Sequence, residues 1–92
     1  MVSQTFVVTE PLGLHLRPAG KLCEIALEYK AKIQLRKGCH YANAKSVLGV
    51  LAAKVQQGDE IEIICDGVDE EEALMRLMEG LRNHFASDDI QN

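Results

Sequence analysis

The sequence Gly13-Leu14-His15-Leu16-Arg17-Pro18-Ala19 separates two different patterns of apolar residues. Before it, residues 2–9 alternate between two faces, with the two-residue period of a half-buried strand. After it, apolar residues recur with helical spacing and predict a helix over about residues 16–29. Pro18 fits the first turn of that helix, because the N–H group that it lacks would have had no partner there. We therefore expect His15 at, or just before, the first residue of the helix.

Two strands and a short helix are predicted next along the chain. Residues 32–36 alternate in polarity, and Lys37-Gly38-Cys39 is typical of a tight turn into a short strand around residues 40–43. Ser46 then precedes a short, very apolar segment, residues 47–55, and has the position of a helix N-cap. A hairpin and a short helix therefore follow the first helix.

A last strand and a last helix complete the predicted elements. Residues 60–65 alternate in polarity, and Asp69 begins a helix with an acidic first turn, whose apolar stripe extends to Phe85. The element order is β-α-β-β-α-β-α. Such a chain closes as two layers, so we expect an α+β fold with one sheet covered by helices on a single face. We expect residues 1–92 to form a single domain, with a frayed tail over residues 86–92.

Composition argues against several classes of function. The net charge of -4 and the scattered basic residues argue against direct binding of nucleic acid, because phosphate backbones are held by concentrated Lys and Arg. No segment has the character of a transmembrane helix and no signal peptide pattern precedes the first strand, so we expect a cytoplasmic protein without membrane insertion. Cys23 and Cys65 are predicted core residues, whereas Cys39 and His40 alone make a poor metal site. The sequence indicates neither a cofactor nor a metal.

The start of the first helix has the features of an anion site. Backbone N–H groups and the positive end of the helix dipole converge there, and Arg17 adds a cation with several donors, an arrangement that suits phosphate. The same field disfavours imidazolium, so we expect His15 to be neutral and to have the lone pair needed to attack a phosphoryl donor. The sequence shows no convincing general base or metal site beside it, which favours a phosphocarrier over a small hydrolase. From spacing alone, an ordinary cap or surface histidine is the alternative.

Two motifs resemble the HPr family, the histidine-containing phosphocarriers of the bacterial sugar phosphotransferase system. They are Leu12-Gly13-Leu14-His15-Leu16-Arg17-Pro18-Ala19 and Asn43-Ala44-Lys45-Ser46-Val47-Leu48-Gly49-Val50, and the likeness covers residues 2–85. The resemblance implies an open-faced β-sandwich with an antiparallel sheet in the order 1-4-2-3 and three helices on one side. It also implies that His15 takes phosphate on Nδ1 from phosphorylated enzyme I and passes it to the A domains of sugar-specific enzymes II. Arg17 would help to hold the phosphoryl group.

Ser46 has two interpretations. In some members of the family the matching serine is phosphorylated by HPr kinase/phosphorylase, and the sequence around Ser46 resembles this regulated type. A catabolite-control transcription factor is then a further expected partner. Phosphate adds roughly -1.5 to -2 charge, which would suit a helix start and repel an acidic partner surface. A serine before an apolar helix is also explained by capping alone.

A docking surface beside His15 is a further implication of the resemblance, since it suggests that the first and second helices lie side by side. The residues expected there are small or apolar, and they are Leu16, Gly20, Val47, Leu48 and Leu51. Exposed apolar patches usually serve docking, although burial would also explain the apolar residues of the second helix. Leu16 is bulkier than the small residue that commonly follows the family's histidine. We expect a monomer.

Two alternatives share this fold. A carrier of the nitrogen-related phosphotransferase chain would use the same chemistry with different partners. A mainly regulatory HPr-like protein would act through phosphorylated Ser46, but it would not need the imidazole of His15.

Overall fold

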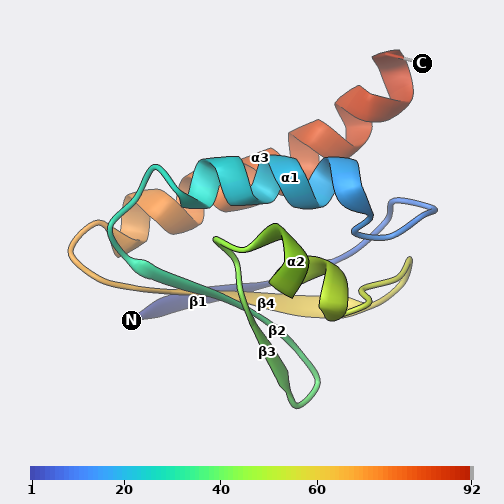
Figure 1. Cartoon of the computed structure of the whole chain (residues 1–92). Coiled ribbons are helices and arrows are strands. Elements are labelled where there is room, and N and C mark those ends of the chain that lie inside the picture. Colours follow the sequence, from blue (N-terminus) through green and yellow to red (C-terminus); the bar gives the residue numbers. More distant parts are fainter. Residues whose placement is uncertain (92) are drawn as a thin grey trace.

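Four strands form one antiparallel sheet. The computed structural model describes the backbone of residues 1–91 and the side chains of residues 1–82. The strands are β1 (Val2–Val7), β2 (Lys32–Lys37), β3 (His40–Asn43) and β4 (Glu60–Asp66). Their order is β1-β4-β2-β3, which confirms the predicted sheet, and each neighbouring pair is antiparallel. Strand β4 is therefore flanked on both sides, and β1 and β3 form the edges (Figure 1).

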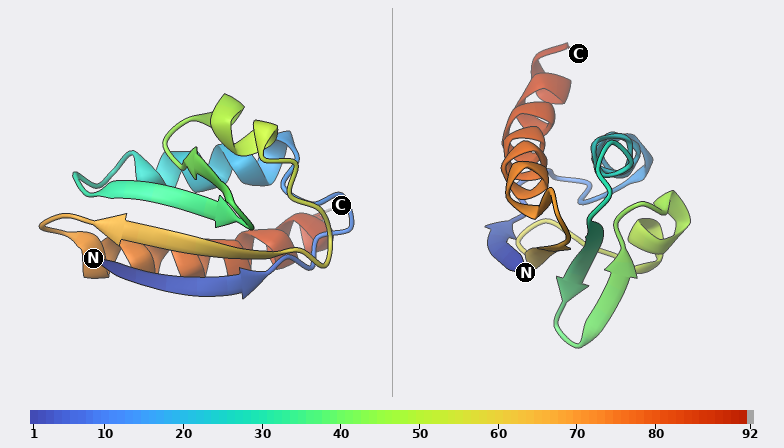
Figure 2. Two further views of the ribbon diagram at one scale, coloured as in Figure 1. Left: turned by 90° about the horizontal axis from the view of Figure 1, so that it is seen from below. Right: turned by 90° about the vertical axis from the view of Figure 1, so that its left-hand side faces the viewer.

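Three helices cover one face of this sheet, as predicted. They are α1 (Leu16–Ala26), α2 (Val47–Ala52) and α3 (Glu70–Gln91). Helix α1 contacts both α2 and α3, and the two views of Figure 2 show the helical layer on a single side of the strands. The other face of the sheet is left open.

The helix ends differ from the sequence pattern. Helix α1 ends before residue 29 because its last turn tightens, with the N–H groups of Glu28 and Tyr29 donating three residues back. Helix α2 ends before residue 55 because Lys54 has a φ of 53°, a left-handed conformation that cannot continue the helix. Helix α3 continues past Phe85 to Gln91. The predicted fraying of residues 86–92 concerns a segment whose side chains lie outside the described residues, and it stays a prediction.

The core lies between the sheet and the helices. Alternate residues of the two inner strands point into it, and α1 and α3 contribute one stripe each. Its largest fully buried side chains include Ile33, Leu35, Ile61, Ile63 and Leu77. Cys23 and Cys65 are buried there too, which confirms their prediction as core residues, and burial raises the pKa of the Cys65 thiol to about 11.

The start of α3 is fixed by two carboxylates. The Asp69 carboxylate accepts the N–H groups of Lys30 at 2.8 Å and Ala31 at 2.9 Å, so it joins α3 to the loop that follows α1. The first of these bonds does most to lower the pKa of Asp69 below its ordinary value. Glu70 accepts the N–H group of Gly67 at 3.0 Å. The acidic first turn is confirmed, but Asp69 binds a neighbouring segment, a role that the sequence pattern did not predict.

Candidate functional site

The loop before α1 is held in place by its backbone. Gly13 has a φ of 69°, and a Cβ atom built on it would lie 2.2 Å from the carbonyl oxygen of Val55, so only glycine fits. Leu14 is buried, and its N–H group donates to that same carbonyl oxygen at 3.0 Å. The N–H group of Gly13 also donates to the carbonyl of Glu10 at 2.9 Å, which closes the turn. The residue after Leu14 therefore has a fixed position.

That residue is His15, and it is the N-cap of α1. Its backbone is extended, with φ -79° and ψ -171°, and its carbonyl oxygen accepts the N–H group of Ala19 at 3.0 Å. Its side chain makes no capping hydrogen bond and is half-buried. The backbone of His15 thus starts the helix, while the fold does not use its imidazole as a cap. The structure places the histidine at the helix start, as expected.

The first turn of α1 has groups that favour an anion next to His15. Pro18 is buried in this turn and has no N–H group, whereas the N–H group of Leu16 has no acceptor within the helix because it belongs to the first helical residue. Arg17 is exposed at the second helical position. A helix dipole, a backbone donor and a guanidinium group at one helix start can together receive a phosphoryl group beside His15.

Ser46 is the N-cap of α2, as predicted. Its hydroxyl oxygen accepts the N–H group of Gly49 at 3.0 Å, and its carbonyl oxygen accepts that of Val50 at 3.0 Å. Its own N–H group donates to Asn43 at 3.0 Å, and the residue is half-buried. The hydroxyl group therefore has a structural role in the unmodified protein.

The residues expected to border His15 differ in exposure. Leu16 is 66% exposed and Leu48 is 79% exposed, so each presents a large apolar side chain to solvent. Gly20, Val47 and Leu51 are half-buried. Since α1 and α2 contact each other, both exposed leucines belong to neighbouring helices. The apolar side chains of α2 are shared between the core, where Val50 is fully buried, and the surface.

Sequence reasoning missed what holds the histidine loop. Glu10 and Val55 contribute carbonyl oxygens to it, from the end of the β1 region and from the segment after α2. The only signal for this contact was Gly13, because a glycine often marks a close approach of two backbone segments. The partner segment has no mark in the sequence.

The described residues lack the features of two other kinds of site. Within that part of the chain, no three or more His, Cys, Asp or Glu side chains group closely enough to hold a metal ion. None of its helices combines the length and the apolar character that crossing a bilayer requires. Cys39 is exposed in the turn between β2 and β3.

The fold and this site together define a class of protein. It is an open-faced β-sandwich that presents one histidine at the start of its first helix, on a loop fixed by backbone hydrogen bonds. Further features define the class: the order of the strands in the sheet, the helices on one side only, and the exposed arginine two residues after the histidine.

Comparison with known proteins identifies the family. The family model described as the PTS HPr component phosphorylation site matches residues 2–83. The phosphocarrier protein HPr of Lysinibacillus sphaericus is 38% identical over 77 residues, which are 84% of this chain and 88% of that protein. The chain belongs to the HPr family of phosphocarrier proteins.

Another relative is a longer protein. The phosphoryl donor subunit DhaM of the PEP-dependent dihydroxyacetone kinase of Providencia stuartii is 36% identical over 80 residues. This match covers 87% of the present chain but only 17% of DhaM. The HPr-like sequence thus also occurs as one part of a larger phosphoryl donor.

Solved structures confirm the fold. The histidine-containing phosphocarrier protein of Mycoplasma superposes with a TM-score of 0.90 at 27% identity, covering 91% of this chain and 96% of that one. Crh, the catabolite repression HPr of Bacillus subtilis, superposes with a TM-score of 0.71 at 34% identity, covering 89% and 94%, and its structure is described as a dimer with a swapped domain. Both likenesses extend over nearly the whole chain.

Proposed function

We propose that this protein accepts a phosphoryl group on His15 from phosphorylated enzyme I and passes it to the A domains of sugar-specific enzymes II. The observation that carries the proposal is the position of His15, a half-buried N-cap whose side chain takes no part in capping. Membership of the HPr family supports it. Both links in this transfer chain are protein partners, which agrees with the exposure of Leu16 and Arg17 beside His15.

The proposed chemistry needs positioning and charge stabilisation only. The lone pair on Nδ1 of a neutral His15 attacks the phosphorus of the donor phosphohistidine, and the donor N–P bond breaks as the new N–P bond forms. Arg17 and the N–H group of Leu16 stabilise the negative charge on the phosphoryl oxygens. The phosphohistidine is transient and passes its phosphoryl group to a second protein, so in this proposal the protein is a carrier and not an enzyme. Neither a cofactor nor a metal takes part in this scheme.

Regulation at Ser46 is a further part of the proposal. HPr kinase/phosphorylase would phosphorylate the hydroxyl group that now accepts the N–H group of Gly49. The added phosphate brings about -1.5 to -2 charge next to the exposed Leu48 and would repel an acidic partner. The likeness to Crh supports a mainly regulatory role as the second candidate function, with a catabolite-control transcription factor as the partner.

We also propose how partners dock. Leu16 and Leu48 are the exposed apolar anchors, and Gly20, Val47 and Leu51 complete the surface between α1 and α2. Apolar anchors ringed by polar groups are typical of transient protein interfaces. The protein would act as a cytoplasmic monomer in a single domain, residues 1–92. The swapped dimer described for Crh makes a dimer the outcome to check by light scattering.

Transfer of labelled phosphate from phosphoenolpyruvate through enzyme I tests the acceptor residue. We expect acid-labile label on the native chain and none on His15→Ala. Arg17→Ala should slow loading by about tenfold or more, whereas Arg82→Ala, which removes an exposed arginine on α3, should load normally. Label retained by His15→Ala would refute the assignment.

The end acceptor is tested by offering the loaded protein different partners. A domains of sugar-specific enzymes II, the corresponding domain of a nitrogen-related chain and a dihydroxyacetone kinase receive labelled phosphate in parallel assays. We expect fastest transfer to the sugar-specific A domains. Faster transfer to either of the other acceptors would keep His15 as the phosphoryl-carrying residue but would contradict the proposed partner. The dihydroxyacetone kinase is included among the acceptors because of the likeness to DhaM.

A further inference from the structure

Residues 54–59, which lead from α2 to β4, support the loop before α1. The carbonyl oxygen of Val55 accepts the N–H group of Leu14 at 3.0 Å. Nearer the other end of the segment, the N–H group of Gly58 donates to the carbonyl oxygen of Val8 at 2.8 Å. The loop that presents the histidine is therefore bonded to this segment at two points, and its position depends on where the segment lies.

The segment has no helix or strand of its own to hold its shape. Its first residue, Lys54, has a φ of 53°, a left-handed conformation that needs support from its surroundings in a residue other than glycine. The shape of the segment therefore depends on bonds from other parts of the fold.

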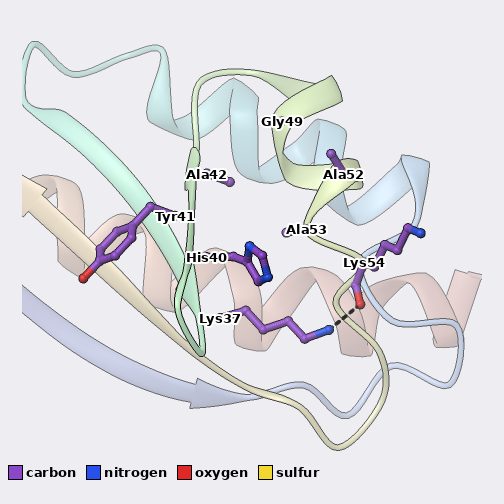
Figure 3. A pocket seen from close by; sticks show the side chains of 8 residues that line it. All are labelled: Lys37, His40, Tyr41, Ala42, Gly49, Ala52, Ala53 and Lys54. Carbon is purple, nitrogen blue, oxygen red and sulfur yellow. Dashed lines mark hydrogen bonds between the residues drawn. The ribbon is translucent and has the colours of Figure 1, made fainter.

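Lys37, the last residue of β2, joins the two ends of the segment. Its ammonium group donates to the carbonyl oxygen of Lys54 at 2.8 Å, the bond that is drawn as a dashed line in Figure 3. The same ammonium group pairs with the carboxylate of Asp59 at 3.1 Å. One side chain thus holds the first and the last residue of the segment together.

Asp59 extends this link to the residue after Val55. Its carboxylate accepts the N–H group of Gln56 at 2.8 Å, and its own N–H group donates to the carbonyl oxygen of Gln56 at 3.0 Å. The bond from Gln56 and, second, the bond from Lys37 hold the pKa of Asp59 below its ordinary value. The residues on both sides of Val55 are therefore tied to Lys37, Lys54 directly and Gln56 through Asp59.

An ion pair of this kind affects position more than folding. Both of its side chains are 31% exposed, and ion pairs in contact with solvent stabilise a fold little. A shift of about 1 Å in a reacting group, by contrast, can slow group transfer by about 100-fold. Val55 is bonded to Leu14, which directly precedes His15, so a displacement of Val55 would move the acceptor histidine.

We propose that Lys37 is a positioning residue for His15. It holds Val55 in place through the residues on either side, and the Val55 carbonyl oxygen in turn fixes the start of α1. The imidazole is thereby presented to the phosphoryl donor at a constant position. The proposal rests on the phosphocarrier function proposed above, to which it adds a residue from another element that takes no part in the chemistry.

Loading of His15 from phosphorylated enzyme I tests the proposal, with Lys37→Met as the variant and Arg36→Met as its matched control. Arg36 also makes one ion pair, with Glu62 at 2.7 Å, and one bond to a backbone carbonyl, that of Gly38 at 2.9 Å. We expect Lys37→Met to lower kcat for loading by about fivefold or more and to leave KM for the carrier within about twofold. Arg36→Met should change both by less than about twofold.

Rescue and amide exchange separate positioning from a general structural role. Lys37→Arg keeps the positive charge and several N–H donors, so it should restore most of the loading rate. Hydrogen exchange of the Leu14 amide reports the bond to Val55 and needs no enzyme I. It should be about fivefold faster in Lys37→Met, whereas the amide of Ile63, a buried residue of β4, should change by less than about twofold.

Asp59→Asn is a second variant that tests the same link if Lys37→Met does not fold. It removes the charge that attracts Lys37 but keeps an oxygen that accepts the N–H group of Gln56. We expect the same changes in the same direction, by about twofold or more.

Three results would overturn the proposal. Normal loading by Lys37→Met would show that the link is not needed, and equal slowing by Arg36→Met would mean a general weakening of the sheet. Slow loading with unchanged exchange at Leu14 would mean that Lys37 acts on the partner directly. A native chain without label on His15 would instead refute the carrier function, and the exchange data distinguish that failure because they do not depend on loading.

Discussion

The starts of α1 and α2 are built alike and used differently. Each helix begins after an extended residue whose carbonyl oxygen accepts the first helical hydrogen bond, His15 in one case and Ser46 in the other. Three residues further on, α2 has Gly49, whose N–H group the Ser46 side chain holds, whereas α1 has Pro18, which has no N–H group. The same position therefore offers a capping donor in α2 and none in α1.

This difference shows how the fold keeps one side chain for chemistry. A cap side chain accepts the N–H group of the second or the third helical residue, and a proline at the third position removes one of these two partners. The imidazole of His15 is not engaged in capping, and the loop itself is held by the backbone bond from Leu14 to Val55. The hydroxyl group of Ser46 is engaged, so its modification would have to replace an existing hydrogen bond.

The largest effect should come from breaking the support of the His15 start. Gly13→Ala would push a Cβ atom into the Val55 carbonyl and should lower the free energy of unfolding by about 3 kcal/mol, with slower loading of His15 as well. Gly38→Ala is the matched control, since Gly38 also has a positive φ but its Cβ would meet nothing within 4 Å. Urea denaturation compares the two, and equal losses would mean that the Val55 contact is unimportant.

Removal of the two cap side chains should separate stability from loading. Ser46→Ala should lower the free energy of unfolding by about 1 kcal/mol through loss of the Gly49 bond and leave loading of His15 intact. His15→Ala should abolish loading and change stability by less than about 0.5 kcal/mol. Urea midpoints and labelled phosphate measure both. A large loss of stability in His15→Ala would show that the imidazole has a structural role.

The role of the proline can be isolated with a double-mutant cycle. Pro18→Ala restores the third N–H group of α1, and His15→Ser supplies a capping oxygen. The double variant should therefore have a free energy of unfolding about 0.5–1 kcal/mol higher than the two single changes predict when added. His15→Ser alone should raise the free energy of unfolding very little. Additive effects, measured by urea denaturation, would contradict this account of why His15 does not cap.

The start of α3, unlike the starts of α1 and α2, is held by a carboxylate, so its contribution to stability should depend on pH. Asp69 accepts two N–H groups of the loop after α1, and its pKa is lower in the folded protein than in the unfolded chain. The stabilisation that the Asp69 carboxylate contributes is therefore complete above the pKa of an unfolded aspartate, about 3.9. It is lost as the pH falls through the lower pKa of the folded state. Asp69→Asn should lower Tm by about 3 °C at pH 7 and by less near pH 2. A constant difference across this range would show that the carboxylate charge is not the cause.

Much of the fold could be predicted because its signals are local. The alternation of residues 2–9 and 60–65 defined strands, and Ser46 before an apolar run defined a cap, since both depend only on neighbours in sequence. The ends of α1 and α2 were wrong by about three residues. A tightened last turn and a left-handed lysine are set by tertiary packing, which sequence spacing does not contain.

The candidate site was predicted in its position but not in its support. His15 and Arg17 followed from a helix start marked by Pro18 and from a family motif. The contact with Val55 joins segments far apart in sequence through a backbone carbonyl, and a carbonyl has no residue type to mark it.

The most direct test of the account is the identity of the phosphorylated atom. Uniformly 15N-labelled protein is treated with catalytic enzyme I and excess phosphoenolpyruvate, and the 15N–31P couplings of its histidines are recorded. We predict one coupling, to Nδ1 of His15, which disappears when a phosphoryl acceptor is added. A coupling at another histidine, or complete loading without a coupling at His15, would contradict the central claim.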